Sequence, residues 1–450
     1  MSLAWGCLSA GLPHSPPHHQ EPDMAAADTA EITEEQFAAE ALEFLEANAK
    51  RKAERREFVW GEGPDNAALF EEVDRERELQ ELEASKEWRA TKYDAGFGWI
   101  SGPTELGGSG MPRKYERVWG QLESQFDTPD GGFFGIGLGM VAPTILAHAS
   151  PEVSADVLPQ MYRADIVGCQ LFSEPGAGSD LASLQMRAER DGEEWILNGQ
   201  KVWTSGAHYS DIGEVIARSD FDQPKHQGLT GFLVDMKAPG VEVRPLRQMT
   251  GGANFNEVYF NEVRVPDSHR LGDVNQGWGV ALTTLMNERA AIGGGSGGGT
   301  GGGSFTKLAA MANHYGLSSD ALSRQKLAEI YTHGKVLGWS NQRTMDALRT
   351  GRTPGPEMSL SKMGLIRQMN ATCEFVADTI GPRLVVDSGE WGTFSWAGYV
   401  LGFPAMRIAG GSDEVMRNIV GERVLGLPKE PGIDTTSPFR DLKVGTQRAE

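Results

Sequence analysis

Cysteine is scarce in this chain, which has only Cys7, Cys169 and Cys373 among its 450 residues. Three thiols so far apart provide neither a disulfide framework nor the short paired spacing of a zinc site. This scarcity is typical of proteins of the reducing cytosol, so we expect a cytoplasmic location. Cys169 precedes a glycine-rich segment, and we interpret it as part of a strand core rather than as a reactive thiol.

Long apolar runs and excess positive charge are also lacking. No run of about 18 apolar residues occurs, which argues against a membrane span. Acidic residues outnumber basic ones by 62 to 42, which gives a net charge of −20. Because nucleic-acid binding rests on phosphate neutralisation by Lys and Arg, this charge argues against nucleic acid as a partner. The length suits two or three domains of a soluble globular protein.

The two ends of the chain show no regular pattern. Residues 1–32 mix Pro, His and Ala without periodicity, and their apolar part lacks the basic start of a signal peptide. We expect a disordered tail there, with Met24 as an alternative start, and a second tail over residues 431–450. The histidines His14, His18 and His19 are interpreted as part of the first tail rather than as a metal site.

Residues 33–168 predict a helical N-terminal domain. Thr33 and Gln36 have the spacing of a capping box, in which each side chain bonds the other residue's backbone N–H. Helical patterns continue over residues 66–95, which are rich in Glu and Arg, and over residues 112–165. Apolar residues recur at helical spacing after the box: Phe37, Ala41, Leu42, Leu45 and Ala49.

Residues 169–275 predict a compact β domain. Apolar and polar residues alternate, and turn signals are frequent. The dipeptides at 191–192 (Asp-Gly) and 198–199 (Asn-Gly) are both predicted to form hairpin turns. Strands are expected at 231–236 and 258–260.

Residues 276–430 return to helical periodicity, with helices expected at 277–292, 318–350 and 356–380. The run at 293–303 consists of Gly apart from one Ser and one Thr. Each Gly costs a helix about 1 kcal/mol relative to Ala, so this run is predicted to be a flexible linker.

Three short blocks carry the chemistry. Residues 170–180 read QLFSEPGAGSD, residues 200–206 read QKVWTSG, and residues 408–414 read IAGGSDE. Glycine-rich turns let backbone N–H groups approach a ligand closely. In this order, the three blocks resemble those of the acyl-CoA dehydrogenase family of flavoenzymes, and the resemblance extends over roughly residues 33–430.

The resemblance implies a mainly α fold with a central β domain. A helical N-terminal domain would precede a β-barrel-like middle domain and a C-terminal four-helix bundle. The implied reaction is FAD-dependent α,β-dehydrogenation of an acyl-CoA thioester to the trans-2-enoyl-CoA, with hydride transfer to flavin N5. Fatty acid β-oxidation, electron transfer flavoprotein as acceptor, and a homodimer or homotetramer are further implications.

The resemblance also assigns residues to the cofactor. It places Phe172, Ser173, Trp203 and Ser205 at the isoalloxazine ring, with Thr204 beside them as a second hydroxyl for the polar rim. Ser179, in the turn with Gly178, lies near the phosphates and serves the substrate together with Arg289. Ser412 and Glu414 match positions at the nucleotide half of FAD. The alternative is a core tryptophan with ordinary turn serines.

The base requires a separate argument. Most family members known to us place a glutamate where this chain has Gly410. A second family pattern places it on the helix that opens the C-terminal domain, where Glu288 matches. Independently, Ala281, Leu285, Glu288 and Ile292 share one helical face, and a carboxylate on an apolar face must be paired or useful. Desolvation there would raise its pKa towards that of a general base.

Alternatives to this base remain open. Glu288 could instead pair with an arginine or end a frayed helix, and Asp413 is the nearest rival carboxylate. Gly410 would keep the backbone N–H that polarises the thioester oxygen, a donor worth about 3–4 kcal/mol in comparable sites. The missing loop glutamate also suggests a non-catalytic partner subunit of a hetero-oligomer.

The resemblance leaves two further functions open. In an acyl-CoA oxidase-like enzyme, oxygen would accept the electrons. A DNA-associated relative of the fold is the least favoured, because of the net charge of −20. Residues 313–317 lack the arginine that many family members use to reach the flavin of a neighbouring subunit, which puts the details of subunit assembly in doubt.

Overall fold

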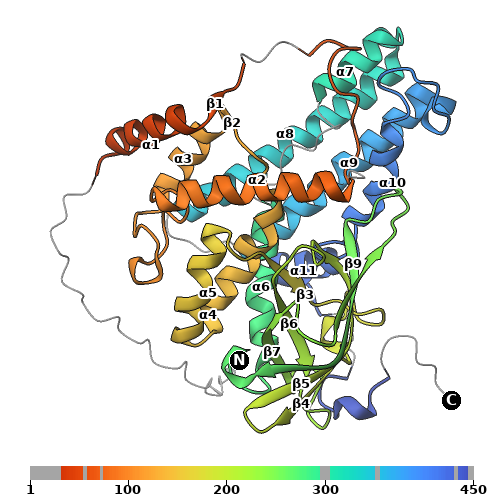
Figure 1. The fold of residues 1–450 in the computed structure, drawn as a ribbon. Helices are drawn as coiled ribbons and strands as arrows, with labels where there is room; N and C mark the ends of the chain where they lie inside the picture. Colours follow the sequence, from red (N-terminus) through yellow and green to blue (C-terminus); the bar gives the residue numbers. More distant parts are fainter. Residues whose placement is uncertain are drawn as a thin grey trace, which may run out of the picture.

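The computed structural model describes residues 32–53, 58–70, 74–293, 305–349, 355–429 and 434–443. Helices dominate both ends of the sequence and flank a central sheet, as Figure 1 shows. The mainly α fold with a central β part is therefore confirmed. Most of the first predicted tail and nearly all of the predicted glycine linker lie outside the described residues. Half of the second predicted tail, residues 434–443, is described, and it packs on the sheet domain with Phe439 buried.

The N-terminal helices begin as the capping pattern predicts. The side chain of Thr33 accepts a hydrogen bond from the backbone N of Gln36, and the side chain of Gln36 accepts one from the N of Thr33. The elements are α1 (Glu34–Asn48), α2 (Arg75–Asp94), α3 (Lys114–Glu123), the π-helix η3 (Gly137–Val141), α4 (Ala142–His148) and α5 (Pro151–Arg163).

The predicted helical stretch over 66–95 is wrong in its first part. Helix α2 begins only at Arg75, after Asp74, whose side chain caps it. Residues 58–70 instead run along the C-terminal helices, where the carboxylate of Asp65 accepts hydrogen bonds from Gly392 N and Ser395 Oγ. Ala67 is buried in the same cluster as Trp396, so tertiary contacts override the local pattern there.

One eight-stranded sheet forms the centre of the molecule. Its strand order is β10-β7-β6-β4-β5-β9-β8, and β3 pairs in parallel with β6. A separate pair, β1 (Lys50–Arg51) with β2 (Phe126–Asp127), links the N-terminal helices. The strands of the sheet are β3 (Gly168–Leu171), β4 (Arg187–Asp191), β5 (Glu194–Ser205), β6 (Ile212–Arg218), β7 (Leu229–Asp235), β8 (Val241–Leu246), β9 (Phe255–Pro266) and β10 (Arg270–Leu271).

One of the two predicted hairpin turns is confirmed and the other is wrong. Gly192, with φ of 64°, lies in the turn between β4 and β5. Asn198 and Gly199 instead lie inside β5, at a shift in its register with β9. The side chain of Asn198 accepts a hydrogen bond from Glu262 N across the strands. The Asn-Gly signal therefore marks a β-bulge rather than a chain reversal.

The C-terminal helices match the predicted ranges closely. They are α6 (Gly277–Gly293), α7 (Phe305–His314), α8 (Ala321–Arg349), α9 (Met358–Ile380), α10 (Trp396–Met406) and α11 (Asp413–Ile419). Among the described helices, none combines the length and the apolar character that crossing a membrane requires.

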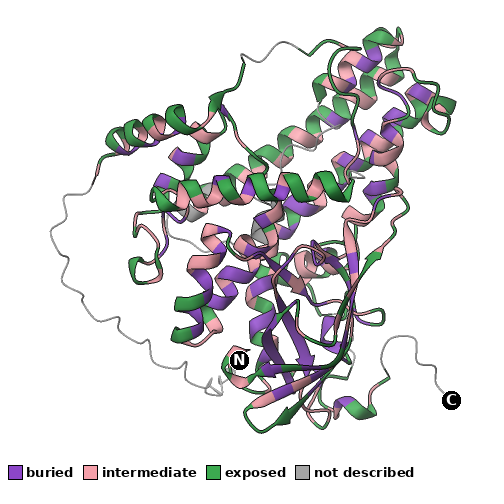
Figure 2. Ribbon diagram, viewed as in Figure 1, coloured by how far each residue is buried: buried purple, intermediate pink, exposed green. Residues whose placement is uncertain are grey.

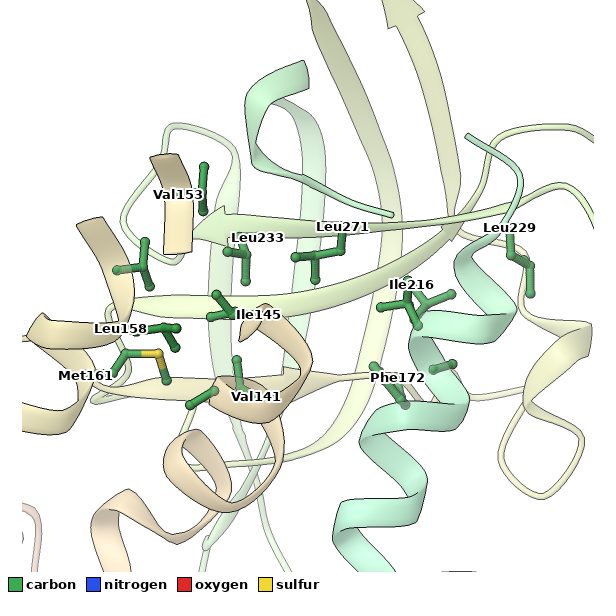
Figure 3. Packing of buried hydrophobic residues seen from close by; sticks show 14 of the residues in the cluster. Val141, Ile145, Val153, Leu158, Met161, Phe172, Ile216, Leu229, Leu233 and Leu271 are labelled. Atoms are coloured by element: carbon green, nitrogen blue, oxygen red, sulfur yellow. The ribbon is translucent and has the colours of Figure 1, made fainter. Parts of the chain in front are cut away.

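Helix α6 joins the three parts of the molecule. Val280 and Ala281 of α6 are buried in one cluster with Phe172 and Ile216 from the sheet and Ile145 from α4. Figure 3 shows the sheet and N-terminal members of this cluster converging, and Figure 2 shows that the strands behind them are largely buried. Because α6 also contacts α9, this helix lies between the sheet and the C-terminal helices.

Candidate active site

The first two sequence blocks lie side by side in the structure. Lys201 Nζ donates to the carbonyl oxygen of Phe172 at 3.0 Å and to Glu174 Oε1 at 2.9 Å. The backbone N of Val202 donates to Ser173 O at 2.9 Å. Lys201 is fully buried, and burial lowers its pKa while the charge of Glu174 opposes that shift. This buried ion pair holds residues 172–174 against β5.

Trp203 lies at the surface, next to the contact between β5 and residues 172–174. Its side chain is 58% exposed, although β5 is otherwise largely buried, and its ring meets Phe255 edge-on with centroids 5.9 Å apart. Its φ of 63° is a strained value for a bulky residue, held in place by the bulged strand around it. The alternative reading as a core tryptophan is therefore wrong. An uncovered indole face fits a planar ring system such as isoalloxazine.

The two hydroxyl residues after Trp203 differ in their surroundings. Ser205 is half-buried, whereas Thr204 is buried and its Oγ1 has no hydrogen-bond partner among the described residues. A buried hydroxyl left unpaired costs about 1–3 kcal/mol. A polar group bound beside β5 would remove that cost, so the residues present are compatible with FAD.

The turn of the first block is fixed by two carboxylates. Glu174 accepts hydrogen bonds from Gln185 N at 2.7 Å and Met186 N at 2.9 Å, in addition to its bond with Lys201. Asp180 accepts from Lys225 Nζ at 2.7 Å. Gly178 and Ser179 between them are exposed, and the space around the Gly178 Cα is open. The backbone of this turn is therefore rigid and accessible to a ligand.

Glu288 lies on a part of α6 that is anchored to the sheet. One turn earlier, Thr284 Oγ1 donates to Glu214 Oε1 of β6 at 2.6 Å and shares a hydrogen bond of 2.8 Å with Thr144 of α4. Glu288 itself is half-buried. The helix continues beyond it to Gly293, so the alternative of a frayed helix end at Glu288 is wrong.

Lys362 of α9 brings the third block towards Glu288. This side chain is only 7% exposed, and its Nζ donates to the carbonyl oxygens of Ala409 and Gly411. Burial lowers the pKa of Lys362, and the negative charges of Asp413 and Glu288 oppose that shift. The buried cation that holds the loop of Gly410 therefore also feels the charge of Glu288.

The remaining residues of the third block have other roles in the structure. Asp413 is bound by Arg407, whose Nε and Nη2 lie 2.8 Å from Asp413 Oδ2. Ser412 caps α11 by accepting from Val415 N, and Glu414 is exposed. The bond to Arg407 occupies the Asp413 carboxylate, which counts against Asp413 as the base. The side chain of Arg289 lies outside the described residues.

Sequence reasoning missed two buried charged residues of this region. Lys362 lies on the same helical face as Ile366 and Met369, so a cation on an apolar face was the available signal. Glu214 is the only charged residue in the strand sequence IGEVIA, residues 212–217. Both signals resemble the one that identified Glu288, namely a charge placed where apolar periodicity predicts burial.

Comparison with known families agrees with this architecture. Residues 169–263 match the acyl-CoA dehydrogenase middle domain, and residues 275–425 match the acyl-CoA dehydrogenase C-terminal domain. Acyl-CoA dehydrogenase IpdE1 of Mycobacterium tuberculosis is 35% identical over 356 residues, which are 79% of this chain and 91% of that protein. The chain therefore belongs to the acyl-CoA dehydrogenase family, whose members are FAD-dependent oxidoreductases.

Two other relatives match over shorter lengths. Acyl-CoA dehydrogenase FadE34 of M. tuberculosis is 38% identical over 64% of this chain, which spans only 39% of that longer protein. Cyclohexane-1-carbonyl-CoA dehydrogenase of Geobacter metallireducens is 36% identical over 33% of this chain and 39% of its own length.

Solved structures share the fold. A structure titled Tcur3481-Tcur3483 steroid ACAD superposes with a TM-score of 0.67 at 24% identity, covering 88% of this chain and 97% of that one. The ChsE4-ChsE5 complex of M. tuberculosis gives a TM-score of 0.66 at 22% identity, with coverages of 90% and 100%. At these identities the likeness establishes the fold alone.

Proposed function

We propose that this chain catalyses the α,β-dehydrogenation of an acyl-CoA thioester, with Glu288 as the base that removes the α-proton. The observation that carries the proposal is the placement of the half-buried Glu288 on the anchored helix α6, where its charge acts on Lys362, the lysine that holds the loop of Gly410. Family membership supports the reaction class, and the ion pair of Asp413 with Arg407 argues against the rival base.

In this proposal each group has one task. Glu288 takes the α-proton, and the backbone N–H of Gly410 donates to the thioester oxygen, on which negative charge accumulates as that proton leaves. Phe172 and Trp203 exclude water from the reacting carbons, and Ser173 and Ser205 orient the ring of the cofactor. FAD, when bound, accepts the β-hydrogen as hydride. Gly178, Ser179, Ser412 and Glu414 are the proposed contacts to its nucleotide part.

The acyl group is proposed to be cyclic or branched rather than a straight chain. Among the relatives whose names state a substrate, the cyclohexane-1-carbonyl-CoA enzyme is 36% identical over its matched segment. Isovaleryl-CoA dehydrogenase and the long-chain enzyme reach 28% and 27% over their matched segments. Fatty acid β-oxidation therefore receives less support than the sequence resemblance suggested.

Anaerobic bleaching of the flavin tests the proposal. The purified FAD-loaded protein is mixed with cyclohexane-carbonyl, branched, sterol-type and straight-chain thioesters, and absorbance near the flavin band is followed. We expect bleaching with at least one cyclic or branched thioester, and a loss of at least 1,000-fold in rate in Glu288→Gln with FAD retained. Positioned bases typically contribute 10²–10⁴-fold.

Two further variants identify the reason for any failure. Glu374→Gln, a change to an exposed glutamate on α9, should bleach at the wild-type rate. If the Glu288→Gln variant still bleaches but the Asp413→Asn variant does not, Asp413 is the base. If none of the thioesters bleaches the wild type, but turnover appears when it is mixed with a second family member, the chain is a partner subunit instead. Fast reoxidation by air with peroxide release would indicate an oxidase.

A further inference from the structure

A buried lysine without a carboxylate bonded directly to it is an expensive feature in a protein interior. Desolvating an ammonium group costs several kcal/mol unless hydrogen bonds and charges compensate. Lys362 is 7% exposed, and among the described residues its hydrogen bonds go to two backbone carbonyls, those of Ala409 and Gly411. The site therefore uses a full charge to hold a short loop.

The loop needs such a tie because its conformation is unusual. Gly410 and Gly411 have φ values of 65° and 98°, which L-residues with a side chain rarely adopt. A Cβ at Gly411 would lie 2.4 Å from Met416 Cε, the end of a flexible side chain, so the backbone conformation rather than packing favours glycine there. Glycine gives a loop more conformational freedom than any other residue, so without a tie this segment would sample several conformations.

The carbonyls that Lys362 binds flank Gly410 on both sides. Fixing residues 409 and 411 leaves the peptide groups of Gly410 little freedom to rotate, because the chain is held one residue before and after it. Contacts of α9 with α11 on one side and α6 on the other hold the lysine backbone itself. Lys362 thus lies on α9, the helix that packs against both α11, which follows the Gly410 loop, and α6, which carries Glu288.

The charges around Lys362 complete the arrangement. Asp413 from α11 and Glu288 from α6 both act on it, and Asp413 is already neutralised by Arg407. Negative charge from two other helices therefore compensates the buried ammonium in part.

We infer that Lys362 is a positioning residue of the proposed reaction centre, which fixes the Gly410 loop by holding the carbonyls on both sides of Gly410. This inference rests on the proposed function for its catalytic half, whereas the loop-holding half depends only on the hydrogen bonds. Lys362 touches neither substrate nor cofactor in this role, so its loss acts on rate rather than on thioester affinity.

The test combines amide hydrogen exchange with flavin bleaching in Lys362→Met. We expect peptides covering residues 405–416 to exchange at least 10-fold faster than in the wild type. The bleaching rate at saturating thioester should fall by about 100-fold, the scale of losing a preorganised oxyanion donor, with the apparent Kd within about threefold. Lys362→Arg, which keeps charge and donors, should recover at least one tenth of the wild-type rate.

Lys326→Met is the matched control, because Lys326 is a half-exposed lysine on α8 that pairs with Asp378 of α9. It should change neither the loop exchange nor the bleaching rate. Unchanged loop exchange and unchanged bleaching in Lys362→Met would overturn the inference. If Lys362→Met does not fold, Lys362→Arg and Lys362→Gln are compared, since only the first keeps the charge, and equal bleaching rates in the two would overturn it.

Failure of the proposed function would appear differently. If the wild type holds FAD but none of the thioesters bleaches it, the proposed reaction is wrong. Amide exchange of the loop, in the apo and FAD-loaded proteins, then tests the loop-holding role of Lys362 by itself. Faster exchange in Lys362→Met, but not in Lys326→Met, then supports the loop-holding role. Equal exchange in all three proteins overturns it.

Discussion

At the scale of single residues, Glu214 is a buried carboxyl group with an energetic cost. It is fully buried, accepts one hydrogen bond from Thr284, and its Oε2 has no partner among the described residues. Burial raises the pKa of Glu214 to about 8. The residue is therefore mostly a neutral acid at pH 7, which lowers the cost of its unpaired oxygen.

This burial predicts a pH-dependent stability. Between pH 4.5 and 8 the folded protein keeps the Glu214 proton that the unfolded chain has released, so raising the pH destabilises the fold. The free energy of unfolding should fall by up to about 1.4 kcal/mol per pH unit on account of this group. In Glu214→Gln that slope should disappear. Urea unfolding of both proteins between pH 5.5 and 8.5 measures the difference.

Glu87→Gln is the control for the Glu214 experiment, because Glu87 is exposed on α2. Its pH dependence should match that of the wild type. A wild type and a Glu214→Gln variant with parallel pH profiles would show that Glu214 is ionised in the folded protein throughout this range, against our expectation.

At the scale of elements, the bulge in β5 is the local feature on which the site depends. Gly199 has φ of 151°, and a Cβ there would lie 2.9 Å from Met186 Cα, a backbone atom that cannot rotate away. The register of β5 against β9 shifts at this point and again between Lys201 and Thr204. Trp203, in the second shift, owes its exposed orientation to this irregular strand.

Gly199→Ala should therefore destabilise the protein and weaken the cofactor site. Strain of this kind costs about 1–3 kcal/mol, and the contact with Met186 adds to it, so we expect a loss of about 3 kcal/mol in the free energy of unfolding. FAD affinity should fall as well, because Trp203 follows the bulge. Chemical denaturation and FAD titration measure the two effects.

Gly192→Ala separates backbone strain from collision. Gly192 also has a positive φ, of 64°, but no atom lies within 4 Å of a Cβ built there. That variant should lose only about 1 kcal/mol and keep its FAD affinity. Equal losses in the two variants would mean that the close approach to Met186 has no energetic consequence.

At the scale of the whole molecule, α8 carries apolar side chains that the described residues leave exposed. The exposed fractions are 47% for Tyr331, 49% for Val336 and 67% for Trp339, and the ring of Phe305 lies 5.0 Å from that of Tyr331. Clusters of this kind mark association surfaces more often than free surface. The expected homodimer or homotetramer remains a prediction that this surface supports.

We expect a second copy of this chain to cover the surface of α8. Light scattering after size exclusion should give a mass of at least two chains, and Trp339→Glu should shift the protein towards the monomer by at least 10-fold in dissociation constant. Leu322→Glu, at an exposed residue of α8 that is 74% exposed and lies two turns away from Tyr331, is the control. A monomeric wild type would contradict the prediction.

Local patterns determined much of the fold. The capping box at Thr33, the turn at Gly192 and the helix over residues 277–292 depend on interactions within a few residues, so periodicity and turn chemistry were sufficient to predict them. The sequence also indicated a partly buried charge, because Glu288 lies on an otherwise apolar helical face. Its role as the base, which came from that face and from the family resemblance, stays a prediction.

Contacts between distant segments decided what the sequence left open. Residues 58–70 lost their predicted helix to the C-terminal helices, and the Asn-Gly turn became a bulge because β9 pairs along the whole of β5. The placement of Lys362 between Glu288 and the Gly410 loop required three helices far apart in the sequence. Local propensity amounts to fractions of a kcal/mol per residue, whereas burying a side chain or pairing a strand contributes more, so the tertiary structure prevails wherever the two disagree.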